Sequence, residues 1–169
     1  IAEEHQLSSR DPRRHLLTIG LEDYFQVDTF DSMIARSQWY RFESRLEHGL
    51  SRTFELLEEV KGTTATFFVR GWIAERYPEL VRSIAKRGHE IASSGYEHRR
   101  LGAFSREQFQ DDLARTREAL ERAVRHRIHG HRVSGWMREK QLWALDALAD
   151  AGYTYDSSLR PMRRAKARD

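Results

Sequence analysis

The sequence predicts an α/β fold with a mainly parallel sheet of about five strands and flanking helices. Short, β-prone apolar segments alternate along the chain with longer segments in which apolar residues recur at helical spacing. Residues that commonly start or stop helices lie at the ends of the longer segments. The chain has 169 residues and no internal repeat, so we expect a single domain.

The first elements are two strands separated by a helix. We expect the first strand at His15–Ile19, where the run HLLTI is short and apolar. A helix is predicted over Ser44–Val60, because Ser44 and Glu47 match a capping box and apolar residues follow at helical spacing. The run TATFFV at Thr64–Val69 is rich in β-branched and aromatic residues and predicts a buried strand.

The middle of the chain continues the alternation. Pro78 is suited to the first turn of a helix, and Gly88 is suited to ending it. A short strand is expected at Glu90–Ser93. Ser105 and Gln108 then match a second capping box at the start of another helix.

The last elements are a strand at Arg127–Arg132, a helix at Arg138–Ala151 that Gly152 ends, and a strand at Tyr153–Ser157. A complete (β/α) barrel has ~250 residues. Five strands therefore predict either part of such a barrel or a smaller open sheet.

The composition excludes several kinds of site. The chain has no cysteine, which rules out disulfides, thiolate catalysis and cysteine-ligated zinc. No apolar run approaches the ~20 residues of a membrane-spanning helix, so we expect no membrane span. The segment Ile1–Arg14 is polar and has no apolar core, so we expect no signal peptide there and a cytoplasmic or membrane-peripheral location.

Basic residues are concentrated at the end of the chain, whose formal net charge is +3. They are Arg160, Arg163, Arg164, Lys166 and Arg168. A basic tail can bind nucleic acid, but no aromatic residues lie between these charges, as base stacking would require. We therefore expect a solvated tail and no nucleic-acid partner. These features divide the chain into a polar segment (1–14), a domain (15–161) and a basic tail (162–169).

Polar residues follow several of the predicted strands. Glu22 and Asp23 follow the first strand, Ser94 and His98 follow the third, Arg132 ends the fourth, and Asp156, Ser157 and Ser158 end or follow the fifth. The segments expected at the rim of the sheet are 20–25, 70–72, 94–99, 132–136 and 156–158. In parallel α/β folds, functional groups gather at the carboxyl ends of the strands. Two carboxylates and an imidazole at one rim can hold a divalent metal ion. The alternative is that the two acids face solvent and that His98 packs within its own loop.

Five stretches of the chain resemble a known family. They are LTIGLEDYFQVDTF (17–30), ATFFVRGWIAERYP (65–78), GHEIASSGYEHR (88–99), GHRVSGW (130–136) and WALDALADAGYTYDSSLRP (143–161). In this order they resemble the polysaccharide deacetylases, also called the NodB homology domain or carbohydrate esterase family four. The branch associated with exosortase and exopolysaccharide systems is the most similar. The resemblance implies a distorted (β/α) barrel of the NodB type, incomplete here, with the later family motifs beyond Asp169.

The resemblance also implies a function and a ligand. Members hydrolyse N-acetyl groups on polysaccharides or oligosaccharides with a water molecule bound to a divalent metal, typically zinc. The implied source is bacterial. By position in the motifs, Tyr24, Phe25 and Trp136 are expected to contact the substrate.

The family's catalytic residues are only partly present. Its base is an aspartate at the position of Gly20, and its first metal-binding histidine lies at the position of Ser94. The second histidine is matched by His98. Glu22 matches the acidic metal ligand, and Asp23 is the alternative. Arg132 matches the arginine that holds the base.

These replacements predict impaired chemistry. A zinc ion activates water when three protein ligands hold it, and loss of a general base typically costs about 10²–10⁴-fold. We therefore expect weak metal binding and weak or no deacetylase activity. The alternatives are a non-catalytic pseudoenzyme that binds carbohydrate or acts as a scaffold, and a truncated fragment without an independent function.

Overall fold

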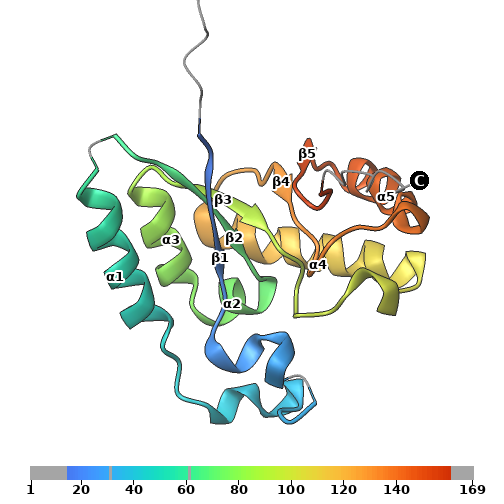
Figure 1. Cartoon of the computed structure of the whole chain (residues 1–169), viewed down its shortest axis with the longest axis horizontal. Helices are drawn as coiled ribbons and strands as arrows, with labels where there is room; N and C mark the ends of the chain where they lie inside the picture. Colours follow the sequence, from blue (N-terminus) through green and yellow to red (C-terminus); the bar gives the residue numbers. More distant parts are fainter. Residues whose placement is uncertain (1–14, 31, 61, 161–169) are drawn as a thin grey trace, which may run out of the picture.

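A computed structural model describes residues 15–30, 32–60 and 62–160 of the chain (Figure 1). The predicted segments 1–14 and 162–169 lie outside these described residues. The prediction of a parallel five-stranded sheet is confirmed: the strand order is β1-β2-β3-β4-β5, and every neighbouring pair is parallel. The strands are β1 (Leu17–Leu21), β2 (Ala65–Val69), β3 (Glu90–Ser93), β4 (Gly130–His131) and β5 (Tyr155–Asp156). The sheet is open, because β1 and β5 form its two edges.

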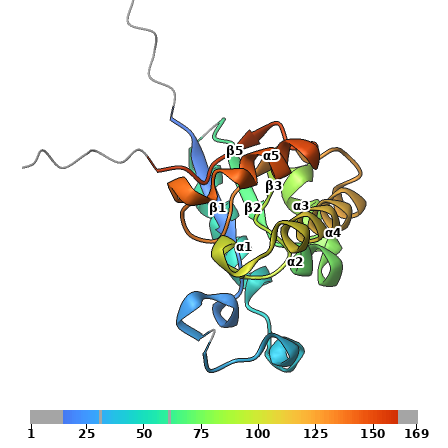
Figure 2. The same ribbon diagram turned by 90° about the vertical axis from the view of Figure 1, so that its right-hand side faces the viewer.

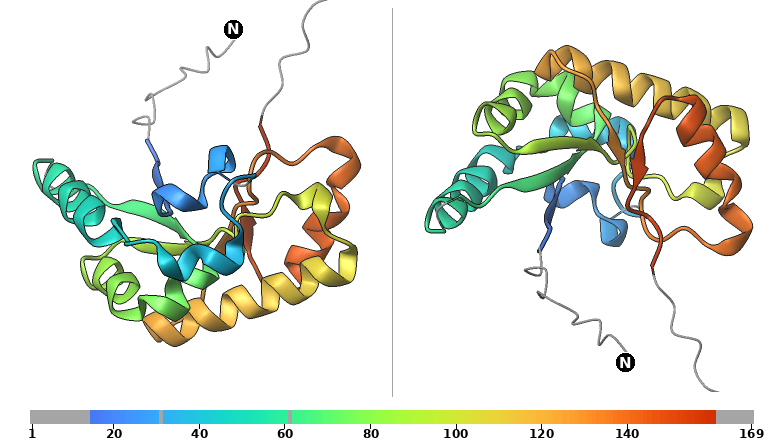
Figure 3. Two further views of the ribbon diagram at one scale, coloured as in Figure 1. Left: turned by 90° about the horizontal axis from the view of Figure 1, so that it is seen from below. Right: turned by 90° about the horizontal axis from the view of Figure 1, so that it is seen from above.

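Helices connect the strands. They are α1 (Leu46–Glu58), α2 (Gly71–Arg76), α3 (Pro78–Lys86), α4 (Arg106–Val124) and α5 (Trp143–Asp150). Helices α2, α3 and α4 contact one another and lie together on one face of the sheet (Figure 3). The sequence prediction missed α2. This helix has only six residues and no side-chain cap, so it carries little sequence signal.

Successive side chains of β2 point to opposite faces of the sheet, one toward the core and the other toward the site. Phe67 is fully buried on the helix side, where its ring lies 6.4 Å from that of Phe54 in α1. Because successive strand residues point to opposite faces, Phe68 points to the other side of the sheet. The guanidinium group of Arg132 covers the Phe68 ring there, 4.0 Å from its centroid.

One capping box is confirmed and one is wrong. The Ser105 hydroxyl accepts a hydrogen bond from the Gln108 backbone N–H at 3.2 Å, as predicted for the start of α4. At α1, however, the N-cap is Arg45, and its side chain makes no capping bond. The carboxylate of Asp23 accepts the Arg45 backbone N–H at 3.2 Å, and the Ser44 hydroxyl accepts the Leu46 backbone N–H at 3.3 Å, so both side chains hold the entry to the helix without forming the predicted capping box.

Three short 3-10 helices follow β1, at residues Tyr24–Gln26, Asp28–Phe30 and Arg36–Arg41. This segment lies beyond the carboxyl end of β1, apart from the helices that cover the sheet (Figure 2). Aromatic rings attach it to α2: the Trp39 and Trp72 rings are 5.4 Å apart, edge to face. The segment also contacts the loop after β3, because Nη2 of Arg36 donates to the His98 carbonyl oxygen at 2.6 Å.

Candidate functional site

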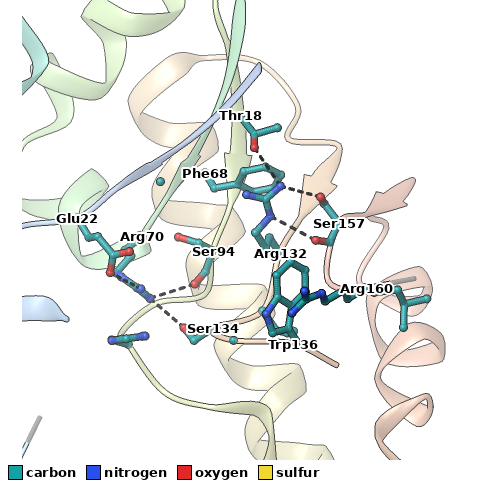
Figure 4. Close-up of a pocket in the computed structure, with 15 residues that line it drawn as sticks. Thr18, Glu22, Phe68, Arg70, Ser94, Arg132, Ser134, Trp136, Ser157 and Arg160 are labelled. Atoms are coloured by element: carbon teal, nitrogen blue, oxygen red, sulfur yellow. Dashed lines mark hydrogen bonds and ion pairs between the residues drawn. The ribbon is translucent and has the colours of Figure 1, made fainter. Parts of the chain in front are cut away.

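A cavity of about 620 Å³ lies at the carboxyl ends of the strands (Figure 4). Residues from or directly after all five strands line it. They are Thr18, Gly20, Glu22, Phe68, Arg70, Ser94, His98, Arg132, Val133, Ser134, Gly135, Trp136, Ser157, Leu159 and Arg160. The structure thus brings together most of the residues that the sequence singled out, and it places three arginines around them.

The centre of this pocket is an ion pair between Glu22 and Arg70. An Nη2 atom of Arg70 lies 2.7 Å from Glu22 Oε2. Nη1 of the same guanidinium donates to the Ser94 carbonyl oxygen at 3.3 Å and to the Ser134 hydroxyl at 3.2 Å. Arg70 is 3 % exposed, whereas 34 % of the Glu22 side chain is exposed. The guanidinium therefore lies between Glu22 and Ser94, the two positions that the resemblance assigns to metal ligands (Figure 4).

Asp23 does not line this pocket. Its carboxylate accepts the backbone N–H of Tyr24 at 3.0 Å and that of Arg45 at 3.2 Å. The residue is 2 % exposed and caps the 3-10 helix that begins at Tyr24. This position gives Asp23 a role in the backbone turn after β1, and its expected role as an alternative metal ligand stays a prediction.

The loop after β3 presents Ser94 and His98 to the pocket. Backbone hydrogen bonds tie this loop to the start of α2, since the carbonyl oxygens of Gly95 and Tyr96 accept N–H groups at 3.0 and 3.1 Å. Gly95 has φ +79°, a left-handed conformation that a side chain would strain. The loop is therefore held in one shape, and Ser94 and His98 stay on the same side of it.

Asp112 in α4 holds the same loop, and its carboxylate accepts the Tyr96 backbone N–H at 3.1 Å. Burial raises the pKa of Asp112 to about 6 from the ordinary 3.8. The folded protein therefore binds this proton more tightly than the unfolded chain does. The contribution of Asp112 to stability grows as the pH falls from 7 through 6, and it is lost as the pH rises.

Asp112→Asn keeps an oxygen that can accept the Tyr96 N–H and removes the titration. We expect the variant to be more stable than the wild type at pH 7. We expect this advantage to shrink by about 1 kcal/mol at pH 5, where the wild-type carboxyl takes up its proton. Urea denaturation of both proteins at the two pH values measures the difference. An advantage that is equal at both pH values would contradict the raised pKa.

Arg132 crosses the open face of the sheet. Its Nη2 donates to the Ser157 hydroxyl at 2.8 Å and to the Thr18 hydroxyl at 3.2 Å, and its Nε donates to the Ser157 carbonyl oxygen at 3.3 Å. All of these acceptors are uncharged. A Cβ atom built on Gly20 would meet nothing closer than Glu22 Oε1 at 3.6 Å, so the position has room for a side chain but carries none.

The three expected substrate-contacting aromatic residues occupy different environments. Trp136 lines the pocket, is 58 % exposed and lies beside Arg160, whose guanidinium is 5.8 Å from its ring centroid. Tyr24 is 38 % exposed but does not line this cavity. Phe25 is 1 % exposed, with its ring 5.5 Å from that of Phe42. The burial of Phe25 corrects its expected contact with substrate, because the ring packs the segment after β1.

The residues present do not fit the divalent metal that the family implies. Within the described ranges, no group of three or more His, Asp or Glu residues could hold a metal ion. Glu22 is bound to a buried guanidinium, and Ser94 offers only a neutral hydroxyl where an imidazole would bind. A metal ion near Glu22 would also approach the positive charge of Arg70.

The fold and the pocket define a class of protein: an α/β domain with its site at the carboxyl ends of a parallel sheet. The family described as polysaccharide deacetylase matches residues 29–155, more than half of the chain. The chain belongs to this family.

Individual relatives agree. Peptidoglycan-N-acetylglucosamine deacetylase of Bacillus cereus is 33 % identical over 75 residues, which cover 43 % of this chain and 27 % of that protein. Chitooligosaccharide deacetylase of Rhizobium leguminosarum biovar trifolii is 29 % identical over 115 residues, covering 68 % and 49 %. The crystal structure of a "putative polysaccharide deacetylase" from Mycobacterium smegmatis has a TM-score of 0.69 and 30 % identity, covering 85 % and 50 %. The chain spans half or less of the length of these relatives.

The sequence places Arg70, Ser134 and Ser157 at the carboxyl rim, because each lies at or just beyond the end of a predicted strand, but it assigns them no role. The structure supplies that role. Arg70 pairs with Glu22, and the Ser134 and Ser157 hydroxyls accept hydrogen bonds from arginine side chains. The described part of the chain contains no helix long and apolar enough to cross a membrane.

Proposed function

We propose that this chain is a carbohydrate-binding domain of the polysaccharide deacetylase family with weak or no deacetylase activity. Its ligand is an N-acetylated polysaccharide or oligosaccharide, bound in the pocket at the carboxyl ends of the strands. The ion pair between Glu22 and the buried Arg70 carries the proposal, because it occupies the carboxylate that metal-dependent hydrolysis would need.

The other pocket residues also indicate that catalysis is weak or absent. Gly20 has no side chain to accept a proton from water, and loss of a general base costs about 10²–10⁴-fold in typical enzymes. Among the described residues, the hydrogen bonds of Arg132 go to hydroxyl and carbonyl oxygens and none goes to a carboxylate that could act as a base. His98 remains the one imidazole among the described residues of the pocket. One imidazole, with no base at position 20 and no second histidine at position 94, is a poor basis for amide hydrolysis.

The same pocket is well suited to holding a sugar. Its volume of about 620 Å³ falls in the usual range for ligand sites. The exposed ring of Trp136 at its edge offers a flat apolar surface for a sugar ring, and hydroxyl groups and arginines supply hydrogen-bonding partners. The relatives named above act, by their names, on peptidoglycan N-acetylglucosamine or on chitooligosaccharide.

A direct test is calorimetric titration with the tetramer of N-acetylglucosamine, together with an assay for released acetate. We expect binding without measurable acetate release. Trp136→Ala is expected to weaken binding by about tenfold through loss of ring stacking, and Trp136→Phe is expected to keep most of the affinity. Trp143→Phe serves as a control, since Trp143 packs against the core away from the pocket.

Two outcomes would contradict the proposal. The first is acetate release by the wild-type chain that a metal chelator abolishes, which would establish metal-dependent hydrolysis. The second is absence of binding by a protein that thermal unfolding shows to be folded.

A further inference from the structure

The pocket carries an excess of positive charge. Its described lining contains three guanidinium groups, those of Arg70, Arg132 and Arg160, and one carboxylate, that of Glu22. The charge of Arg70 is matched by Glu22 at 2.7 Å. Among the described residues, no carboxylate lies within 4 Å of the guanidinium nitrogens of Arg132 or Arg160. Two positive charges at this rim thus have no direct counter-charge.

The acid whose charge acts on Arg132 makes its hydrogen bonds elsewhere. Asp156 in β5 contributes to the field at Arg132, but its carboxylate accepts the backbone N–H of Ser158 at 2.9 Å and the Ser158 hydroxyl at 2.6 Å. These bonds close a turn at the end of β5. Asp156 therefore lowers the positive potential at Arg132, but it forms no ion pair with the guanidinium group.

Arg132 is fixed in place by neutral groups and keeps a donor for a ligand. Nε and Nη2 donate to Ser157 and Thr18, and the guanidinium lies over the Phe68 ring. Nη1 makes no hydrogen bond with a described residue and is not a buried atom. An arginine held in this way loses little entropy when it binds an anion.

Arg160 and Trp136 form the second half of the arrangement. The guanidinium of Arg160 lies 5.8 Å from the centroid of the exposed Trp136 ring (Figure 4). A sugar ring that stacks on Trp136 would place its substituents next to this charge. A charge on one of those substituents would distinguish one class of saccharide from another.

From this geometry we propose that the pocket binds acidic saccharides, with Arg132 and Arg160 receiving a carboxylate borne by the sugar. A carboxylate matches the planar fork of a guanidinium and forms charge-assisted hydrogen bonds with it. The inference rests on the proposed function, because it assumes that the pocket holds a saccharide. It goes further in stating that the saccharide carries a uronic acid or a similar carboxylate.

The test compares three tetrasaccharides by calorimetric titration of the whole chain. The first alternates glucuronic acid with N-acetylglucosamine, the second is the same molecule with its carboxyl groups reduced to alcohols, and the third is the neutral tetramer of N-acetylglucosamine. We expect the acidic molecule to bind about tenfold more tightly than its reduced form. We expect the preference to weaken as NaCl rises from 0.05 to 0.5 M, values chosen to shorten the screening length from ~13 to ~4 Å.

Variants then assign the preference to residues. Arg132→Gln and Arg160→Gln are each expected to reduce the preference to about threefold or less, because each weakens binding of the acidic molecule more than binding of its reduced form. Arg122→Gln is the matched control, because Arg122 is an exposed arginine of α4 that pairs with Glu118 outside the pocket. If Arg132→Gln does not fold, Arg160→Gln alone decides, since Arg160 makes no hydrogen bond with a described residue.

Each result has a definite meaning. Equal binding of the acidic and reduced molecules overturns the acidic-saccharide inference and leaves the proposed function standing. Absence of binding by all three overturns both. Inorganic phosphate that binds as tightly as the acidic tetrasaccharide would identify a site for a free anion and overturn the inference. A preference that survives in both pocket variants overturns the assignment to Arg132 and Arg160.

Discussion

The double variant Ser94→His, Arg70→Leu is expected to bind Zn²⁺ at least about 100-fold more tightly than the wild-type chain, whereas Ser94→His alone is expected to improve affinity by less than about tenfold. The resemblance assigns Ser94 and His98 to a pair of histidine ligands and Glu22 to the acidic ligand. Restoring the histidine would complete the set of donor types. The structure adds a second obstacle, because Glu22 is already bound to Arg70.

Electrostatics decides between the two variants. The Arg70 guanidinium lies 2.7 Å from Glu22 Oε2, so a zinc ion held by that carboxylate would be about 4 Å from a positive charge. At an effective dielectric constant of about 20, repulsion between Zn²⁺ and one positive charge at that distance is about 8 kcal/mol, which exceeds the gain from one additional ligand. Arg70 is 3 % exposed, so solvent screens its charge only weakly. The new histidine is therefore expected to raise zinc affinity strongly only when the charge of Arg70 has been removed.

Zinc titration of the wild type, both single variants and the double variant measures the effect. Arg70→Leu alone is expected to bind weakly, because Glu22 and His98 are too few ligands. Ser157→His combined with Arg70→Leu is the matched control, since Ser157 lines the same cavity but binds Arg132 instead of facing Glu22. Tight zinc binding by Ser94→His alone would show that Arg70 does not block the site.

The strand and helix order was predictable because each element carries a local signal. The buried strand β2 and the capping box at Ser105 are examples, and both lie where the sequence predicted them. The strand β1 was misplaced by two residues, from 15–19 to 17–21. Its pattern is weak because β1 is an edge strand with mostly exposed side chains.

The partners of the site residues were not predictable from local patterns. Glu22 and Arg70 are 48 residues apart, and only the parallel pairing of β1 with β2 brings them together. Asp23 and Arg45 meet through a turn that no short motif encodes. The residues of the rim could therefore be named from the sequence, while the charge pairing that governs their chemistry required the structure.

The same ion pair predicts an asymmetric effect on stability. Glu22→Ala is expected to lower the free energy of unfolding by about 2 kcal/mol, whereas Arg70→Leu is expected to change it by less than about 1 kcal/mol. Removing Glu22 leaves a guanidinium that is 3 % exposed without its counter-charge, and Nε of that group already has no hydrogen-bond partner among the described residues. The expected loss is below that of a fully buried pair, because 34 % of the Glu22 side chain is exposed and water moderates the field.

Removing Arg70 has a smaller expected effect for the opposite reason. Glu22 is left on the exposed side of the pair, where water can solvate its carboxylate, and leucine fills much of the buried space.

The double variant Glu22→Ala, Arg70→Leu should recover most of the stability lost in Glu22→Ala. Urea denaturation of the four proteins gives the coupling energy, and Glu118→Ala in the exposed pair with Arg122 is the control, with an expected loss below about 0.5 kcal/mol. If Arg70→Leu is as destabilising as Glu22→Ala, the guanidinium stabilises the pocket by itself and is not a buried charge that depends on Glu22.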